Sequence, residues 1–116
     1  MKTYAGLLML TAAIAVSSPG NAAPRSGFEW GHYDSALYAY SKHPERLPQF
    51  EEALRAAIAR GNANHRLAPG LQAELGYCLL ADGKKSEANE LFKAEMTSFP
   101  ESREFMEKIM GGGAGQ

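Results

Sequence analysis

Histidine serves both as a metal ligand and as a general base, so the three histidines are the first residues that could define a site. His32, His43 and His65 lie in three separate loop or helix-end regions of the 116-residue sequence. No two of them have the i, i+4 or short-loop spacing that brings metal ligands together. We therefore predict solvated or hydrogen-bonding histidines, with no metal site and no bound cofactor.

The single cysteine and the carboxylate pairs do not indicate catalysis. Cys78 falls on the apolar side of a predicted helix without a basic residue within one turn, so we expect an inert thiol in the core. Glu51 and Glu52 are adjacent, and Glu101 and Glu104 are three residues apart. An acid/base pair must instead face across a cleft with one carboxyl desolvated. We predict solvated helix faces at both pairs, and a protein that is not an enzyme.

The segment from Phe28 to Tyr40 is rich in aromatic residues, and two interpretations stay open. In the first, Trp30, Tyr33 and Tyr38 pack on the rest of the domain and complete a small core. In the second, some of them line a groove for a peptide or a glycan, since aromatic rings give large contact areas at low entropic cost. The sequence favours the first interpretation and keeps the second as a candidate binding surface.

Tyr77 is a second candidate for binding, together with Ala73 and Leu80. The three residues are spaced to share one face of a predicted helix, and a tyrosine there offers a broad ring with a polar tip. We expect these residues to line a groove that holds a partner protein.

The elements that must position these residues read as helices. No stretch alternates polar and apolar residues as a half-buried strand does, so the predicted fold is all-α with four to five helices. Short connections favour antiparallel neighbours. Gly61 is expected to stop the second helix and Asp82-Gly83 to form a tight turn. The helices are expected over residues 35–42, 47–60, 69–81, 85–97 and 101–110.

Residues 69–100 resemble one tetratricopeptide (TPR) repeat, a helix–turn–helix unit of 34 residues. In that comparison Gly76 and Ala88 are small where two helices approach, and Phe92 fills the gap between them. The matching residues are Leu75-Gly76, Gly83, Ala88, Phe92 and Pro100. Where the repeat has its usual Trp, Tyr, second-helix aromatic and late Ala, this sequence has Gln72, Leu79, Lys85 and Glu95.

These departures weaken contacts to neighbouring repeats, so the unit is expected to stand alone or at an end. A single repeat cannot bury its apolar face by itself. We therefore interpret residues 35–60 as a degenerate partner hairpin and residues 101–110 as a capping C-terminal helix.

The first 22 residues read as a signal peptide for export. Lys2 is followed by an apolar run from Ala5 to Val16 and by small residues up to Ala22. This run would span about 18 Å as a helix, too short for the ~30 Å bilayer core, so we expect no direct membrane span. The mature chain is then a helical domain over residues 23–110 with a disordered glycine-rich tail over 111–116. The 12 basic residues form no block, which argues against a nucleic-acid partner.

The segment 28–110 as a whole resembles a family of small predicted bacterial lipoproteins of unknown function. The residues that carry this resemblance are Trp30-Gly31-His32-Tyr33, Leu37-Tyr38, Pro44-Glu45, Pro69-Gly70, Glu74-Leu75-Gly76-Tyr77 and Pro100-Glu101-Ser102. The resemblance implies a periplasmic or outer-membrane-associated protein. Family members are often encoded beside a curli-secretion-channel-like lipoprotein, which implies such a protein as a partner.

One departure from this family concerns the membrane anchor. A lipoprotein carries an acylated cysteine at its cleavage site, whereas Cys78 lies in the middle of the domain. We therefore expect a periplasmic protein that reaches the outer membrane only through a partner. The predicted function is a non-catalytic envelope adaptor with a TPR-like groove, and the alternative is a peptidoglycan-associated module or a regulator of a cell-wall enzyme.

Overall fold

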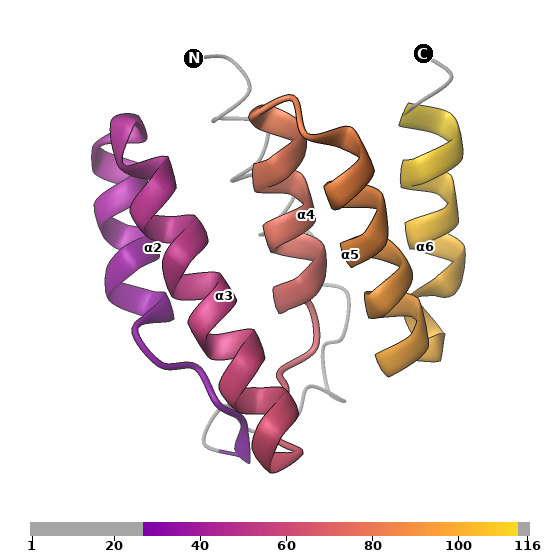
Figure 1. Ribbon diagram of the computed structural model, residues 1–116, viewed down its shortest axis with the longest axis horizontal. Coiled ribbons are helices and arrows are strands. Elements are labelled where there is room, and N and C mark those ends of the chain that lie inside the picture. The colour runs from indigo at the N-terminus through magenta and orange to yellow at the C-terminus, as the bar shows by residue number, and fades with distance from the viewer. Residues whose placement is uncertain (1–26, 114–116) are drawn as a thin grey trace.

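The computed structural model describes residues 27–113, which form a row of five α-helices (Figure 1). Each helix packs against the next one in the sequence. The all-α prediction is confirmed, with no strand within the described range. The expected signal peptide lies outside the described residues, as does the end of the tail. The helices are α2 (Tyr33–Lys42), α3 (Leu47–Asn64), α4 (Leu71–Ala81), α5 (Lys85–Ser98) and α6 (Arg103–Lys108).

Short helical turns precede α3 and α6 and follow α6. Pro44 and Pro100 begin the two 3₁₀ turns, Pro44–Arg46 and Pro100–Ser102, where the missing N–H of proline costs no hydrogen bond. A π-helical turn over Ile109–Gly113 continues α6. The helix predicted to end at residue 110 thus runs three residues further.

Gly61 does not end its helix as we predicted, because α3 continues to Asn64 and ends at His65 in a left-handed conformation (φ 59°). Gly61 is instead buried where the chain folds back over α3. A Cβ at this position would lie 2.7 Å from the Cα of Leu67. The absence of a side chain therefore permits close contact between α3 and the segment that leads to α4.

That returning segment also holds the N-terminal residues of the domain. The amide of Glu29 donates a hydrogen bond to the carbonyl of Arg66 at 2.8 Å, within an isolated bridge between Glu29 and Leu67. The side chain of Arg60 reaches the Glu29 carboxylate at 3.2 Å. These contacts tie residues 27–30 to the end of α3.

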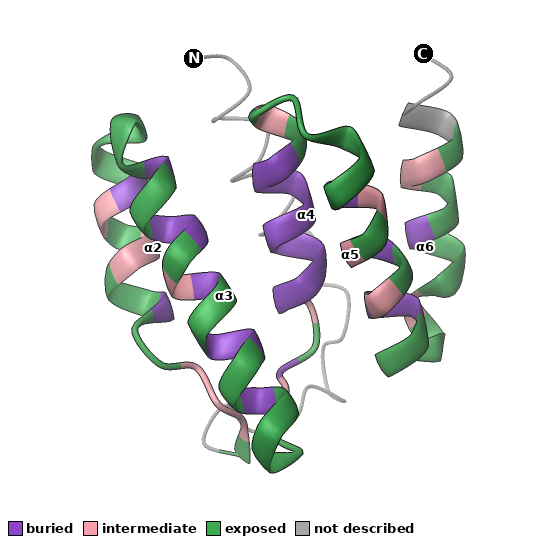
Figure 2. Cartoon of the chain, in the orientation of Figure 1, coloured by how far each residue is buried: buried purple, intermediate pink, exposed green. Residues whose placement is uncertain are grey.

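The centre of the row is α4, which is buried from Leu71 to Leu79 (Figure 2). A helix that is apolar on all sides suits an interior position, with α3 on one side and α5 on the other. The prediction that Gly76 allows a close helix approach filled by Phe92 is confirmed. A Cβ on Gly76 would lie 2.5 Å from the Phe92 ring.

Of the three aromatic residues that were expected to complete the core, Tyr33 is buried, whereas Tyr38 is exposed. Tyr40, which we did not single out, is buried as well, and its ring stacks on Phe50 of α3 at 5.3 Å between centroids. The Tyr33 hydroxyl donates a hydrogen bond of 2.8 Å to Glu74, which links α2 to α4. None of the described helices is long and apolar enough to cross a membrane.

Candidate functional site

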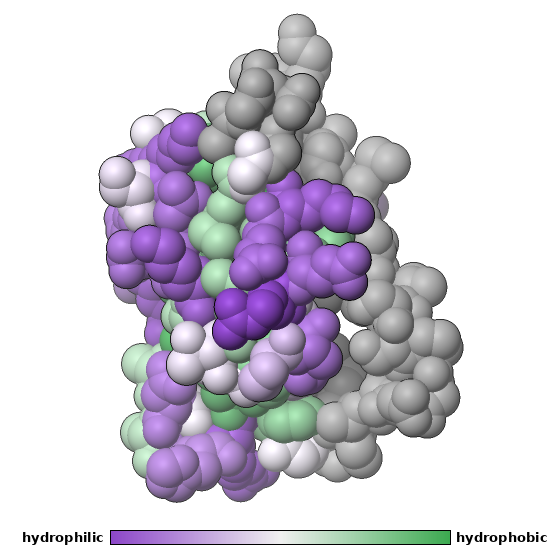
Figure 3. Space-filling model, turned by 90° about the vertical axis from the view of Figure 1, so that its right-hand side faces the viewer, coloured by the Kyte–Doolittle hydropathy of each residue, from purple (hydrophilic) through white to green (hydrophobic). Residues whose placement is uncertain are grey.

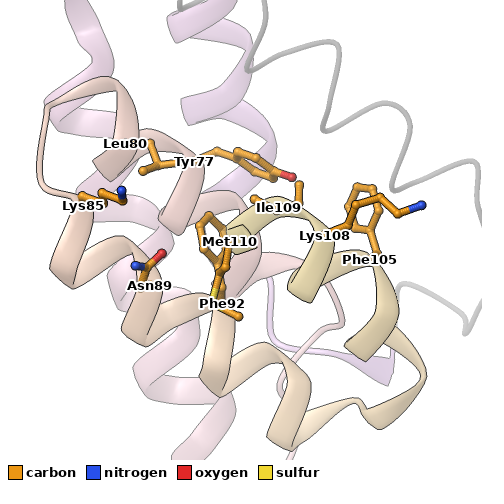
Figure 4. A pocket seen from close by; sticks show the side chains of 9 residues that line it. All are labelled: Tyr77, Leu80, Lys85, Asn89, Phe92, Phe105, Lys108, Ile109 and Met110. Atoms are coloured by element: carbon orange, nitrogen blue, oxygen red, sulfur yellow. The ribbon is translucent and has the colours of Figure 1, made fainter. Parts of the chain in front are cut away.

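A groove of about 500 Å³ lies between α4, α5 and the C-terminal helix (Figure 4). Its volume is in the range of pockets that hold small ligands or a few peptide side chains, about 300–1,000 Å³. Three helices contribute to the walls, so the groove exists only when the hairpin α4–α5 is covered by α6. The lining residues are Tyr77, Leu80, Lys85, Asn89, Phe92, Phe105, Lys108, Ile109 and Met110.

Most of the groove surface is apolar. Phe92 is buried between the helices and contacts the Tyr77 ring edge to face, at 5.3 Å between centroids. Leu80 and Phe105 are 38% and 40% exposed, which makes them two of the three large apolar residues most open to solvent among those described. Figure 3 shows the side of the molecule that α6 covers, where apolar atoms are visible between hydrophilic side chains. Exposed apolar side chains gathered in a hollow are typical of a binding surface.

Among the described residues that line the groove, Tyr77 carries the one buried polar side chain. The residue is 8% exposed, and its hydroxyl has no hydrogen-bond partner within residues 27–113. Burial raises the pKa of the phenol above its ordinary value, so the hydroxyl stays protonated and can donate. Figure 4 shows the ring reaching from α4 toward Ile109. A buried hydroxyl without a partner costs about 1–3 kcal/mol, which a ligand carbonyl in the groove could recover.

Basic and amide groups border the apolar surface. Lys85 and Lys108 lie at opposite ends of the set of lining side chains, and Asn89 lies near Lys85 on α5 (Figure 4). Among the described residues, no acidic side chain lines the groove. The site therefore combines an apolar floor with a positive border.

The structure separates the residues that we singled out from the sequence as partner-binding candidates. Tyr77 and Leu80 line the groove, as expected, whereas Ala73 is 1% exposed and lies in the core. Ala73 is one turn before Tyr77 on α4, where the helix is already enclosed between α3 and α5. Only the C-terminal half of α4 reaches the groove.

The aromatic N-terminal residues lie away from the groove, at the other end of the row of helices (Figure 1). Trp30 is half-buried against Tyr33, at 5.3 Å between ring centroids. Tyr38 is 65% exposed on α2, and the ammonium of Lys42 lies 5.5 Å from its ring centre. The candidate residues therefore belong to two separate surfaces.

The sequence reasoning missed the contribution of the last helix to the groove. Phe105 is exposed at the groove, whereas Met106 is the buried residue of α6. The spacing of Phe105 and Ile109, which are one helical turn apart, could have indicated that both side chains lie on the same face of the last helix. Lys85 and Asn89 are also one turn apart on α5, and both face the groove.

Glu51 corrects another expectation, since we predicted a solvated helix face at this position. The residue is 8% exposed on α3, and one carboxylate oxygen has no hydrogen-bond partner among the described residues. Burial raises the pKa of Glu51 to about 7, and the nearby Asp82 carboxyl adds to the rise against the opposing charges of Lys84 and Arg55. A hydrophobic pattern alone could not reveal this, because Asp82 comes from the turn after α4.

Glu95 is buried as well, and it caps a helix other than its own. Its carboxylate accepts hydrogen bonds from the amides of Gly70, at 2.8 Å, and Ala73, at 3.3 Å, at the start of α4. Burial raises the pKa of Glu95, while the two backbone hydrogen bonds oppose the rise. Gly70 offers no side chain for capping, so α5 supplies the acceptor that the first turn of α4 needs.

The remaining groups that could do chemistry lie apart from the groove. Cys78 is buried in the core as predicted, and burial is the main cause that raises its thiol pKa. His32, His43 and His65 are exposed and distributed along the chain. Within the described residues, histidines, cysteine and carboxylates form no group of three or more that could hold a metal ion.

The comparison with protein families places the chain in a class. The family described as Domain of unknown function (DUF4810) matches residues 28–109, which is most of the sequence. The chain belongs to this family of helical domains. The comparisons with curated proteins and with solved structures gave no match.

Proposed function

We propose that this protein is a non-catalytic adaptor that holds a segment of a partner protein in the groove between α4, α5 and α6. The observation that carries the proposal is the set of exposed apolar side chains, Leu80 and Phe105, beside the buried hydroxyl of Tyr77. Exposure of the two apolar side chains to water, and burial of a hydroxyl without a hydrogen-bond partner, do not stabilise the folded domain. A partner that inserts an apolar side chain and a backbone carbonyl would satisfy them together.

Three structural features support a TPR-like interpretation of the hairpin α4–α5. Gly76 lies against Phe92, Gly83 adopts a left-handed turn (φ 80°), and Pro100 begins the turn that leads to α6. In such an arrangement α6 stands where the first helix of a following repeat would pack. Glu95 stands where the TPR repeat has alanine, and its side chain caps the start of α4 instead of facing another repeat.

The proposed compartment is the periplasm. Its support is the signal-like segment over residues 1–22, together with the resemblance to small predicted lipoproteins. The partner that we propose is an envelope protein, and a curli-secretion-channel-like lipoprotein is the candidate that the resemblance supplies. Such a partner would hold the domain at the outer membrane without a lipid of its own.

The absence of catalysis is part of the same proposal. An enzyme needs an acid, base or nucleophile that meets the substrate in a cleft. The groove offers a neutral tyrosine, an amide and two lysines, while the carboxyls with raised pKa, Glu51 and Glu95, lie outside it. These groups suit recognition better than bond cleavage.

Site-specific photo-crosslinking in living cells tests the adaptor proposal. A photoreactive amino acid placed at Phe105 should capture the partner, because this side chain is exposed at the groove. The same amino acid at Tyr38 is the matched control, since it is an exposed aromatic position at the other end of the molecule. A captured protein at Phe105 that disappears on Tyr77→Ala supports the proposal. Capture at Tyr38 alone would contradict it.

A peptidoglycan-associated module is the second candidate, and Tyr38 favours it. Its ring is 65% exposed and flanked by Lys42, a combination that can stack on a sugar ring and pair with a carboxylate. Sedimentation with purified sacculi distinguishes the two proposals. Retention that is lost in Tyr38→Ala and kept in Tyr77→Ala would favour the cell-wall role.

A further inference from the structure

We infer that the segment held in the groove is an acidic peptide, in which an aspartate or glutamate stands beside a bulky apolar side chain. This inference rests on the proposed function and adds the chemistry of the partner. It follows from the charges at the border of the groove, from the polar groups in its walls and from the composition of the rest of the chain.

The two lysines at the border of the groove have no acidic partner within the described residues. Lys85 and Lys108 make no ion pair there, whereas other basic side chains of the same helices do. Lys93 pairs with Glu90 on α5, and Arg103 pairs with Glu107 on α6. Among the described residues, the two lysines are the cations of the groove that have no ion pair, and no carboxylate lines the groove. They lie at opposite ends of the set of lining residues and so place positive charge at both ends of the apolar lining (Figure 4).

The walls favour a peptide over a hydrocarbon chain with a terminal carboxylate. The buried Tyr77 hydroxyl and the Asn89 amide both lie among apolar side chains. A hydrocarbon chain would leave these groups without partners, at a cost that cancels part of the gain from burial. A peptide backbone supplies a carbonyl for the hydroxyl and both a donor and an acceptor for the amide.

The sequence outside the described residues does not have the composition that the groove requires. Residues 1–26 contain Lys2 and Arg25 and no aspartate or glutamate. Residues 114–116 provide no bulky apolar side chain. We therefore assign the groove to a segment of a second protein that carries the acidic and apolar side chains which these residues lack.

Selection from a display library of random short peptides on the purified protein tests this inference. We expect the enriched sequences to combine a leucine, phenylalanine, isoleucine, methionine or tryptophan with an aspartate or glutamate within two positions. A fluorescent peptide made from the enriched sequence should lose about tenfold in affinity when its acidic residues become asparagine or glutamine. The affinity should also fall as sodium chloride is added, because the lysines are exposed.

Charge reversal supplies a test that does not depend on loss of folding. The double variant Lys85→Glu/Lys108→Glu should select basic in place of acidic peptides from the same library. Lys93→Glu is the matched control, since it places the same change on α5 outside the groove. This control should keep the acidic preference.

The outcomes separate the inference from the proposed function. Enrichment of uncharged or basic peptides by the unmodified protein, with binding lost in Tyr77→Ala, would overturn the acidic inference and leave the adaptor standing. An unchanged preference in the double variant would also overturn it. Enrichment of no peptide at all, or binding of dodecanoate in preference to every peptide, would overturn both.

Discussion

Three glutamates, Glu51, Glu74 and Glu95, are buried in this domain, and each has its own reason. Glu95 accepts two amides of α4, and Glu74 accepts the hydroxyl of Tyr33. Glu51 lacks an equivalent donor for one of its oxygens and lies near Asp82. Because a buried carboxyl with an unpartnered oxygen favours its protonated form, Glu51 should make the stability of the domain depend on pH, and Glu95, whose pKa burial also raises, should act in the same direction.

We predict that stability falls as pH rises from 5 to 8 because of Glu51. Its pKa is raised from 4.5 to about 7 in the folded state, so folding binds a proton in this range. The stabilisation is full below the unfolded pKa and is lost as pH rises through the folded value. Glu51→Gln should flatten this slope and add about 1–2 kcal/mol at pH 8. Urea unfolding followed by circular dichroism at each pH measures both effects.

Glu52→Gln provides the control for this prediction. Glu52 is the exposed neighbour of Glu51 on the same helix, so the same chemical change should leave the pH dependence of unfolding as it is. If the two variants behave alike, the carboxyl of Glu51 is solvated in the folded protein and the assigned environment is wrong.

The local sequence patterns predicted each helix. The observed helix boundaries differ from the predicted ones where residues distant in the sequence pack against the end of a helix. The tight turn at Gly83 was foreseeable from local chemistry alone. The end of α3 was not, because Gly61 reads as a stop signal unless one knows that residues 66–68 fold back over it. The part of the groove that the C-terminal helix forms was missed for the same reason, since α6 must first be placed against α5.

Gly61→Ala should destabilise the domain, although alanine favours helix more than glycine does by about 1 kcal/mol. The added methyl would approach the backbone of Leu67 at 2.7 Å, and a backbone atom cannot move aside as a side-chain end can. We expect a net loss of about 1–3 kcal/mol in urea unfolding.

Asn62→Ala tests whether this loss arises from the close contact. Asn62 is exposed on the adjacent position of α3, so only the gain in helix propensity should remain, within about 0.5 kcal/mol. If Gly61→Ala were instead more stable, a Cβ at residue 61 would have to lie further than 2.7 Å from the Cα of Leu67.

The whole molecule is a single row in which the central helix is enclosed and the last helix is exposed on most of its surface. Helical class, the closeness of α4 and α5, and the burial of Tyr33 and Cys78 followed from residue types and spacing. The separation of Trp30 and Tyr38 from Tyr77 did not follow, because it depends on the order in which the helices stack. A local sequence pattern predicts a helix, but it does not predict which helices lie at opposite ends of the molecule.

Hydrogen exchange followed by mass spectrometry should reflect this arrangement. The amides of α4 should exchange slowest and those of α6 fastest, because among the described helices α6 packs chiefly on α5, and Met106 is its one buried residue. An acidic peptide in the groove should slow α6 and leave α2 unchanged, with a peptide lacking acids as the control. Equal protection of α4 and α6 would indicate that the domain opens only as one cooperative unit.

The sequential packing of the helices has a consequence for the order of assembly. Proteins dominated by contacts between sequence neighbours have low contact order and fold within microseconds to milliseconds. A chain that is synthesised from its N-terminal end can therefore pair α2 with α3, and then add α4 and α5, before the remainder is made. The groove is completed last, by α6 and the turn Ile109–Gly113. Competence to bind a partner would thus require that the entire domain has been synthesised and folded.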